Sequence, residues 1–299
     1  MSTADYSAAC GWCGAALRAR ADRRWTRVRC DRCGVETTWP IPSDADLDRA
    51  YGDWYRPSSG RFSGLGDHVL RRLRGRLAAR LDQIAPPGPV LDVGAGDGAL
   101  LDALAAHGRE AVGLERRSTR PDVRAAELAE ISERWAAIVF WHSLEHLRGP
   151  GQALDRATGL LEPGGVIVIA MPNPASIQAR LFGDRWLALD LPRHLTHVPA
   201  AALLARLRSA GMNPQRVSYL RGGQVVFGWL HGIIGSLPGR PDLYDAIRRP
   251  DARQAPISSG RRALTLMAGA LALPLAIVAA LLEAWSGRGG TVYVEVRRT

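Results

Sequence analysis

Two pairs of cysteines near the start of the chain have the spacing of a metal site. Cys10-Gly-Trp-Cys13 and Cys30-Asp-Arg-Cys33 are separated by 16 residues, and a glycine follows each pair. Each pair can present two sulfurs to one tetrahedral ion, and the glycines suit the tight turn of a zinc knuckle. Four thiolates would close the coordination shell, so we predict a structural Zn²⁺ ion. Four free thiols and a redox pair are the alternatives.

A second group of reactive side chains lies in "WHSLEHL" (141–147). His142, Glu145 and His146 stand at positions i, i+3 and i+4, so they share one face if a helix begins where the preceding apolar run ends. The group could be a general base with its orienting carboxylate, or a divalent-metal site. Alternatively, Glu145 and His146 only cap and brace the helix.

A glycine-rich turn follows an apolar strand in "PVLDVGAGDGALLDAL" (89–104) and leads into a helix. Glycine is needed where a turn is tight and a ligand approaches the backbone. Gly94, Gly96 and Ala99 also fit the dinucleotide fingerprint, and Glu115 ends the next strand, where a carboxylate can bind ribose hydroxyls. On these residues alone, two alternatives therefore remain: the turn of an NAD-dependent oxidoreductase, and a turn that binds no ligand.

The elements that must position these residues alternate strands with helices. Residues 86–222 repeat short apolar runs and helical patterns, as βαβ units do. "AAIVFWHSLEHL" (136–147) is a buried strand that runs into a loop and a helix. "LEPGGVIVIAMPNP" (161–174) is a helix end, a turn and another strand. The pattern predicts an α/β fold.

Four motifs in order, "LDVGAGDG", "GLE", "WHSLEHL" and "LEPGG", resemble the class I S-adenosylmethionine-dependent methyltransferases. The likeness is to the bacterial branch with an "LEH" motif after the fourth strand (methyltransferase type 11/23-like). It covers about residues 86–220 and the C-terminal tail, and a zinc-ribbon-like head is also similar to that of bacterial members. The resemblance implies a Rossmann-like, seven-stranded sheet with helices on both faces and S-adenosyl-L-methionine as cofactor.

The resemblance also assigns the cofactor-binding residues. The methionine end of the cofactor should lie against Asp92, Gly94, Ala95, Gly96 and Gly98. Glu115 should hold the ribose hydroxyls, and His142 should lie near the bound cofactor.

Methyl transfer is an in-line displacement, so the protein mainly positions two partners, and a hydroxyl acceptor also needs a base. We take His142, Glu145 and His146 as candidate catalytic residues. Related quinone O-methyltransferases carry Glu-x-x-Glu-His at this place, but a histidine in the first position makes Mg²⁺ less natural.

The segment "DLPRHLTH" (190–197) is similar to a "D-x-P-x-H" stretch of the family. In the family this stretch lies over the active site. His194 is therefore a further candidate catalytic residue, and His197 a weaker one. Asp190 and Arg193 stand beside them. The two histidines could also be polar residues at a helix entry.

Two apolar segments, 224–237 and 263–282, fall between the expected sixth strand (214–221) and seventh strand (291–298). A single membrane crossing would leave the last strand on the wrong side, unable to pair. Pro274 should kink the second segment, and the first is too short to span a bilayer. The segments could dip into one leaflet or lie flat at its interface, cover a hydrophobic face or a dimer partner, or form a two-span hairpin.

The flanks of the apolar segments favour monotopic membrane association. Trp229 and Trp285 stand where interfacial aromatic residues belong, and arginines flank the long segment. The chain has 39 basic and 29 acidic residues, a net charge of +10, and no lysine. Without a compact basic-aromatic module, anionic lipid is a better partner than nucleic acid, which we do not expect. The excess of arginine could also reflect genome composition alone.

We expect five segments: a zinc ribbon (1–40), a helical linker (41–85), the methyltransferase core (86–222), an apolar helical insertion (223–290) and the last core strand (291–299). The start of the chain lacks a secretory signal, so we expect a cytoplasmic enzyme, peripheral or monotopic at the inner face of the cell membrane. The acceptor should be lipid-linked, a glycan or quinone-like, and methylated on oxygen. A homodimer is an open option, and a non-catalytic methyltransferase-like scaffold is the other alternative.

Overall fold

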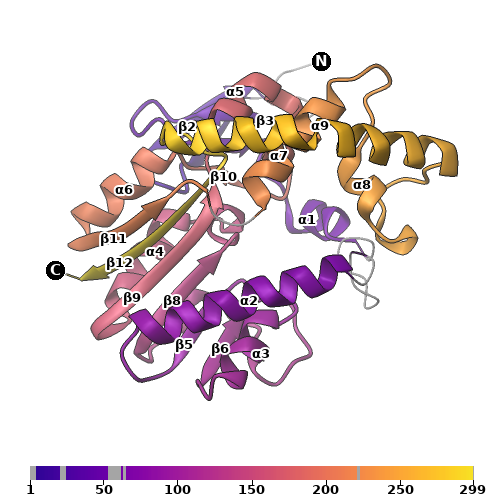
Figure 1. Cartoon of the computed structure of the whole chain (residues 1–299). Helices are drawn as coiled ribbons and strands as arrows, with labels where there is room; N and C mark the ends of the chain where they lie inside the picture. The colour runs from indigo at the N-terminus through magenta and orange to yellow at the C-terminus, as the bar shows by residue number, and fades with distance from the viewer. Residues whose placement is uncertain (1–4, 21–24, 53–61, 63–64, 221–222, 299) are drawn as a thin grey trace.

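The computed structural model describes residues 5–20, 25–52, 62, 65–220 and 223–298, and a seven-stranded sheet forms its centre (Figure 1). In spatial order the strands are β11 (Met212–Ser218), β12 (Thr291–Arg298), β9 (Leu161–Pro172), β8 (Trp135–Trp141), β5 (Val90–Val93), β6 (Ala111–Leu114) and β7 (Val123–Arg124). The strands from β9 to β7 are parallel, and β12 is antiparallel to both β9 and β11. The predicted α/β fold with a Rossmann-like sheet is confirmed.

Helices cover both faces of the sheet: α2 (Leu65–Ile84), α3 (Ala99–Ala106), α4 (Pro150–Gly159) and α6 (Ala200–Ser209). Side chains alternate along β8, as the pleat of a strand requires. Val139 points into the core under α2 and α3, where it joins Leu81. Phe140 points into the core on the other face, with Leu154 of α4. These central strands are apolar on both faces because both faces are covered.

The N-terminal head consists of two hairpins, β1 (Asp5–Ala9) with β2 (Ala16–Arg20), and β3 (Thr26–Arg29) with β4 (Glu36–Trp39). It is not a separate unit. β4 pairs with β10 (Thr196–His197), so the second hairpin and the end of the 190–197 segment share one three-stranded sheet. Trp12, Val35 and Trp39 of the head belong to the same apolar core as α4 and α6. After the head, α1 (Asp44–Ala50) begins at its N-cap, Ser43.

The insertion between β11 and β12 is helical, with α7 (Gln224–Gly235), α8 (Leu243–Ile247) and α9 (Ser259–Trp285). It leaves the sheet at the end of β11 and returns at the start of β12, and these two strands pair. Both ends of the insertion therefore lie on the same side, as the sequence predicted. α9 crosses the top of Figure 1 and continues through Pro274 without interruption.

One predicted feature of the insertion is wrong. Trp229 does not face outward as an interfacial anchor: it is only 9% exposed, and its indole N–H donates to Glu283 Oε2 at 2.9 Å. Glu283 also accepts from the backbone N–H and side-chain amide of Gln178, on α5 (Ile177–Phe182), at 2.7 and 2.8 Å. This buried carboxylate joins α5, α7 and α9. Trp285, in contrast, is 89% exposed.

Candidate active site

The glycine-rich turn connects β5 to α3 in a conformation that only glycine adopts easily. Gly94, Gly96 and Gly98 all have positive φ, and Gly98 is the N-cap of α3. A Cβ added to Gly94 would lie 2.4 Å from the Cβ of Ser143. The neighbouring Ala95 is 8% exposed. The turn therefore brings bare backbone against the residues that follow β8, as a ligand-binding turn requires.

Two acidic residues border this turn. Asp92 is 4% exposed, and burial raises its pKa to about 7 despite the opposing charge of Arg74. Glu115 follows β6, and its Oε2 accepts the Gly96 N–H at 2.9 Å. A buried carboxylate of this kind is stabilised by a cationic ligand, and a carboxylate held beside the turn can accept ribose hydroxyls. The residues fit a sulfonium-bearing nucleoside such as S-adenosylmethionine.

His142 and Glu145 meet directly after β8. The helix predicted from this point is wrong: the chain makes one 3₁₀ turn, Leu144–His146, and α4 begins only at Pro150. The turn ends at Leu147, whose backbone is extended, and Pro150 is the first residue of α4. His142 has φ +53, and its Nδ1 lies 3.5 Å from Glu145 Oε1, an ion-pair distance rather than a hydrogen bond.

Glu145 is the centre of the group. It is 2% exposed, and neither carboxylate oxygen has a hydrogen-bond partner among the described residues. Burial opposes its charge, but His142 and the two other imidazoles outweigh this and lower its pKa to about 2. The side chain is therefore an anion that needs positive charge or donors nearby.

His194 reaches Glu145 from the loop before β10. Its Nδ1 lies 2.9 Å from the carbonyl oxygen of Ala188, which can only accept a hydrogen bond, so Nδ1 carries a proton. Nε2 lies 3.9 Å from Glu145 Oε1 and 3.8 Å from Asp190 Oδ2. Asp190 adopts a left-handed backbone and pairs with Arg193. The predicted "D-x-P-x-H" stretch thus lies against the "LEH" motif.

His146 contacts both neighbouring loops and the ring of His194. Its Nδ1 lies 2.9 Å from the Arg193 carbonyl and 3.0 Å from the Tyr51 hydroxyl, and its ring packs edge-on against His194 at 4.6 Å. Burial lowers its pKa to about 4, so it is neutral near pH 7. His197 contacts Thr38 instead of the group, with Nε2 3.1 Å from the threonine hydroxyl.

Two kinds of chemistry suit this group. His194, backed by Glu145 and Asp190, has the arrangement of a general base with orienting carboxylates. Glu145, His146 and His194 can also offer three ligand atoms within 4.8 Å of one another. One carboxylate and two imidazoles suit Zn²⁺ or Fe²⁺ better than Mg²⁺.

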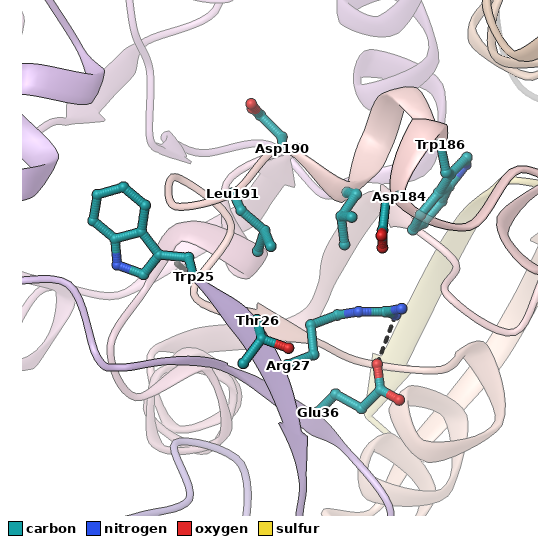
Figure 2. A pocket seen from close by; sticks show the side chains of 9 residues that line it. Trp25, Thr26, Arg27, Glu36, Asp184, Trp186, Asp190 and Leu191 are labelled. Atoms are coloured by element: carbon teal, nitrogen blue, oxygen red, sulfur yellow. Dashed lines mark hydrogen bonds and ion pairs between the residues drawn. The ribbon is translucent and has the colours of Figure 1, made fainter. Parts of the chain in front are cut away.

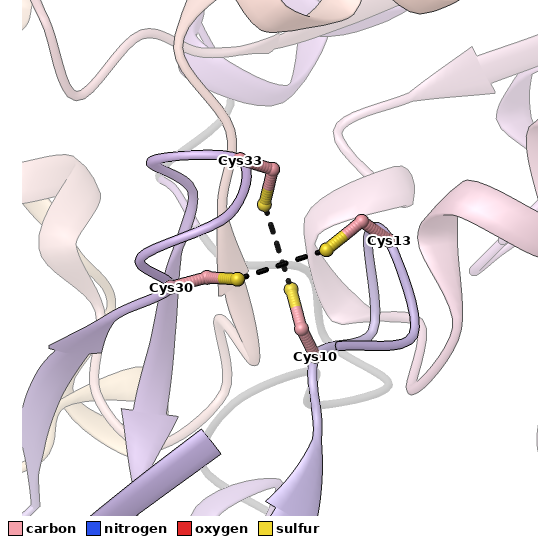
Figure 3. A group of neighbouring side chains, drawn as sticks. All are labelled: Cys10, Cys13, Cys30 and Cys33. Atoms are coloured by element: carbon pink, nitrogen blue, oxygen red, sulfur yellow. Dashed lines mark hydrogen bonds between the residues drawn. The ribbon is translucent and has the colours of Figure 1, made fainter. Parts of the chain in front are cut away.

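The four cysteines of the head converge, as Figure 3 shows. The Sγ atoms of Cys10 and Cys33 lie 3.7 Å apart, and those of Cys13 and Cys30 lie 3.6 Å apart. Sulfurs at the corners of a zinc tetrahedron are roughly 3.8 Å apart, given a Zn–S bond near 2.3 Å. The site therefore has the dimensions of a four-thiolate zinc centre.

Thr38 and Tyr51 were not predicted as functional residues. Each contacts a histidine of the 142–197 region from an element far away in sequence. No periodicity or motif marks such a contact.

Comparison with known proteins agrees with this geometry. The profile of a protein family described as "Methyltransferase domain" matches residues 66–217. An enzyme of Cereibacter sphaeroides named "Ubiquinone biosynthesis O-methyltransferase" is 27% identical over 205 residues, which cover 57% of this chain and 81% of that protein. An enzyme of the same name from Xanthomonas campestris pv. campestris is 27% identical over 168 residues, covering 46% and 70%.

Among solved structures, the crystal structure of the [4+2]-cyclase SpnF is similar in fold. Its TM-score is 0.51 at 18% identity, over 86% of this chain and 97% of that chain. A cyclase on this fold illustrates that the fold alone does not determine the reaction. The family match, in contrast, spans the glycine turn, Glu115, the "LEH" motif and His194.

Proposed function

The chain belongs to the methyltransferase-domain family and is an S-adenosylmethionine-dependent methyltransferase, and we propose that it methylates a hydroxyl oxygen of an apolar or lipid-linked acceptor at a membrane surface. Oxygen is proposed because the relatives from C. sphaeroides and X. campestris are named O-methyltransferases. The observation that carries the membrane part is the exposed apolar face of α9. The family match leaves no support for an NAD-dependent oxidoreductase.

The cofactor would be held by the turn after β5. Asp92 and the Gly94–Gly98 backbone would contact its methionine end, and Glu115 its ribose. When bound, S-adenosylmethionine supplies a methyl group on a positively charged sulfur. The role of the chain is to hold the acceptor oxygen in line with that methyl and to remove the proton of the hydroxyl.

His194 is the base that we propose. Its Nδ1–H is engaged by the Ala188 carbonyl, so in the neutral ring Nε2 is the nitrogen that can accept a proton. Glu145 and Asp190 lie within 3.9 Å of Nε2 and would stabilise the imidazolium that forms when the acceptor hydroxyl gives up its proton. The His194→Gln variant should bind S-adenosylmethionine normally and lose turnover.

α9 has apolar residues on two faces. Small buried residues, Thr265, Gly269, Ala276 and Ala280, lie toward the protein. Larger apolar residues form a stripe at helical spacing on another face: Leu264, Met267, Leu271, Leu275, Val278, Leu282 and Trp285. Their exposure ranges from 53% to 89%. A stripe of this length on a 27-residue helix, about 40 Å long, is a surface for an apolar partner.

The stripe is proposed to lie in the membrane interface rather than across the membrane. By length and composition alone, α9 is the one helix among the described residues that could span a bilayer. It cannot do so once while β11 and β12 stay paired, because both ends of the insertion meet the same sheet. Burying the exposed 61–78% of Leu271 or Leu275 would contribute about 1 kcal/mol each. Several such residues are enough for reversible binding.

Isothermal titration with S-adenosylmethionine tests the cofactor assignment. Wild-type protein should bind, and the Asp92→Ala and Glu115→Ala variants should bind more weakly. A folded protein that does not bind, with variants that make no difference, would refute the assignment. Labelled cofactor incubated with a membrane extract should then identify the acceptor.

Flotation with phosphatidylglycerol-containing vesicles tests the membrane assignment. The wild-type protein should float with the vesicles, and the Leu271→Glu/Leu275→Glu variant should remain in the bottom fraction of the gradient. The matched control is Leu70→Glu, which replaces a 45% exposed leucine on α2 instead of α9. If the double variant floats like the wild type, lipid does not bind this face. If it instead changes the sedimentation coefficient without vesicles, the stripe is a dimer contact.

We also propose that the four-cysteine site holds one structural Zn²⁺. The support is the spacing of the sulfurs and the closed set of four thiolates.

A further inference from the structure

A cavity of about 500 Å³ lies between the zinc-ribbon hairpin and the segment that leads to the active-site loop (Figure 2). Its walls come from two parts of the chain that are far apart in sequence. Trp25, Arg27 and Glu36 belong to the ribbon, while Asp184 and Asp190 belong to the segment before His194. Neither the sequence motifs nor the family match, which begins at residue 66, accounts for the ribbon half of this cavity.

The cavity is directly connected to the proposed base through one residue. Asp190 lines the cavity, and its carboxylate lies 3.8 Å from His194 Nε2. Thr38, on the strand that carries Glu36, donates its hydroxyl to the His194 backbone carbonyl. The ribbon therefore forms a wall of the cavity and also holds the base behind it.

The chemistry of the walls suits an uncharged ring with hydroxyl groups. Trp25 is 38% exposed and offers a flat indole face. Arg27 donates to Glu36 at 2.7 Å, and both side chains remain about 30% exposed, so they can also bind hydroxyls. Glu36 is paired with Arg27 and Asp190 with Arg193, so Asp184 adds a negative charge to the lining and disfavours a phosphate or carboxylate ligand.

The inner wall connects the cavity to the membrane-facing insertion. Trp186 and Leu189 line the cavity and are buried, and both pack in the same apolar cluster as Trp229 of α7 and Ala276 of α9. The cavity wall is therefore packed against the inner, buried face of α9.

We propose that this cavity is the acceptor-recognition subsite and that it binds a hydroxylated ring, phenolic or sugar, carried by the acceptor. The inference rests on the proposed methyltransferase function and deepens it. It makes the zinc ribbon a part of the acceptor site instead of a separate recruitment module.

The test follows the indole resonance of Trp25 by NMR in full-length protein labelled with ¹⁵N-tryptophan. The peak is assigned by its disappearance in the Trp25→Phe variant. Catechol and methyl glucopyranoside are titrated separately, in the presence of S-adenosylhomocysteine. We expect a saturable shift of the Trp25 peak with one of the two probes, which identifies the source of the ring.

The indole of Trp285 is an internal control, because it is 89% exposed on α9 and does not line this cavity. If neither probe moves the Trp25 peak, or if both peaks move alike, the subsite is absent. The Asp184→Asn variant should weaken the binding of the active probe, while Arg18→Ala, on the other ribbon hairpin, should not. Cofactor binding is measured on the same samples by calorimetry, so failure of the methyltransferase assignment and failure of the subsite are separate results.

Discussion

Removal of the Thr38 hydroxyl, on the head strand β4, should lower turnover by displacing the proposed base, His194. Thr38 is fully buried on β4, and its Oγ1 donates to the backbone carbonyl of His194. The same oxygen lies 3.1 Å from His197 Nε2, and the Thr38 backbone N–H donates to Leu195 at 2.9 Å. The Thr38→Val variant keeps the shape and the backbone bond, and loses both hydroxyl contacts.

The expected cost follows from the groups left without partners. A buried polar group that loses its hydrogen bond costs about 1–3 kcal/mol. The His194 carbonyl and His197 Nε2 are both affected, so we expect Thr38→Val to lower the free energy of unfolding by roughly 2–4 kcal/mol. Displacement of His194 by a fraction of an ångström should lower kcat by roughly tenfold to a hundredfold. Cofactor affinity should not change, because the glycine turn lies on other strands.

The neighbouring residue is a matched control. Thr37 is also buried, but its hydroxyl has no hydrogen-bond partner among the described residues. Thr37→Val should therefore be neutral or slightly stabilising, and Thr38→Ser should restore most of the lost activity. The assays are urea denaturation, calorimetry with S-adenosylmethionine, and transfer of labelled methyl to membrane extract. Equal effects of the two valine variants, or wild-type turnover in a folded Thr38→Val protein, would refute the reasoning.

Three further predictions concern other parts of the fold. Burial, with His194 and Arg27 nearby, lowers the pKa of His197 from 6.5 to about 3. Between these two pH values the unfolded chain binds more protons than the folded chain. The free energy of unfolding should therefore fall as the pH falls through that range. Denaturant titrations should show a shallower fall for His197→Asn; an unchanged slope would contradict this. Glu283→Gln should lower the melting temperature by an amount equivalent to about 1–3 kcal/mol, because an amide cannot accept all three donors; Glu110→Gln, at an exposed position, is the control. Elemental analysis should find one zinc per chain in the wild type and less in Cys13→Ser. A wild type that contains no zinc and melts at the same temperature as Cys13→Ser would argue against the centre.

The sheet and the cysteine site could be predicted because their signals are local. Each strand of the core is a short apolar run bounded by turn residues, and the order of the motifs sets the order of the strands. The CxxC pairs needed no tertiary information, since the knuckle geometry is contained in four residues. The return of the insertion to the sheet followed from the strand-like tail, "TVYVEVRR", which had to pair with a strand already formed.

Contacts between distant elements could not be predicted in this way. Trp229 was expected at a membrane interface because it lies in an apolar segment, but Glu283 gives its indole a buried partner 54 residues away. In the sequence, Glu283 is only the residue after the uncharged segment 263–282, and nothing there marks it as a partner of Trp229. Likewise, the spacing of His142 and Glu145 suggested a helix, whereas the chain makes one 3₁₀ turn, becomes extended at Leu147 and starts α4 only at Pro150.

The segment from Trp186 to His197 is where the three parts of the molecule meet. Its first residues, Trp186 and Leu189, pack on the apolar insertion. Its last residues, Thr196 and His197, pair with the ribbon strand β4. Between them stand Asp190 and His194, which face Glu145 of the core. A change in the insertion or in the ribbon therefore reaches the proposed base through a single short stretch of backbone. This connectivity gives the cysteine-bearing head and the apolar insertion a shared structural role: each fixes one end of the loop that carries the proposed base.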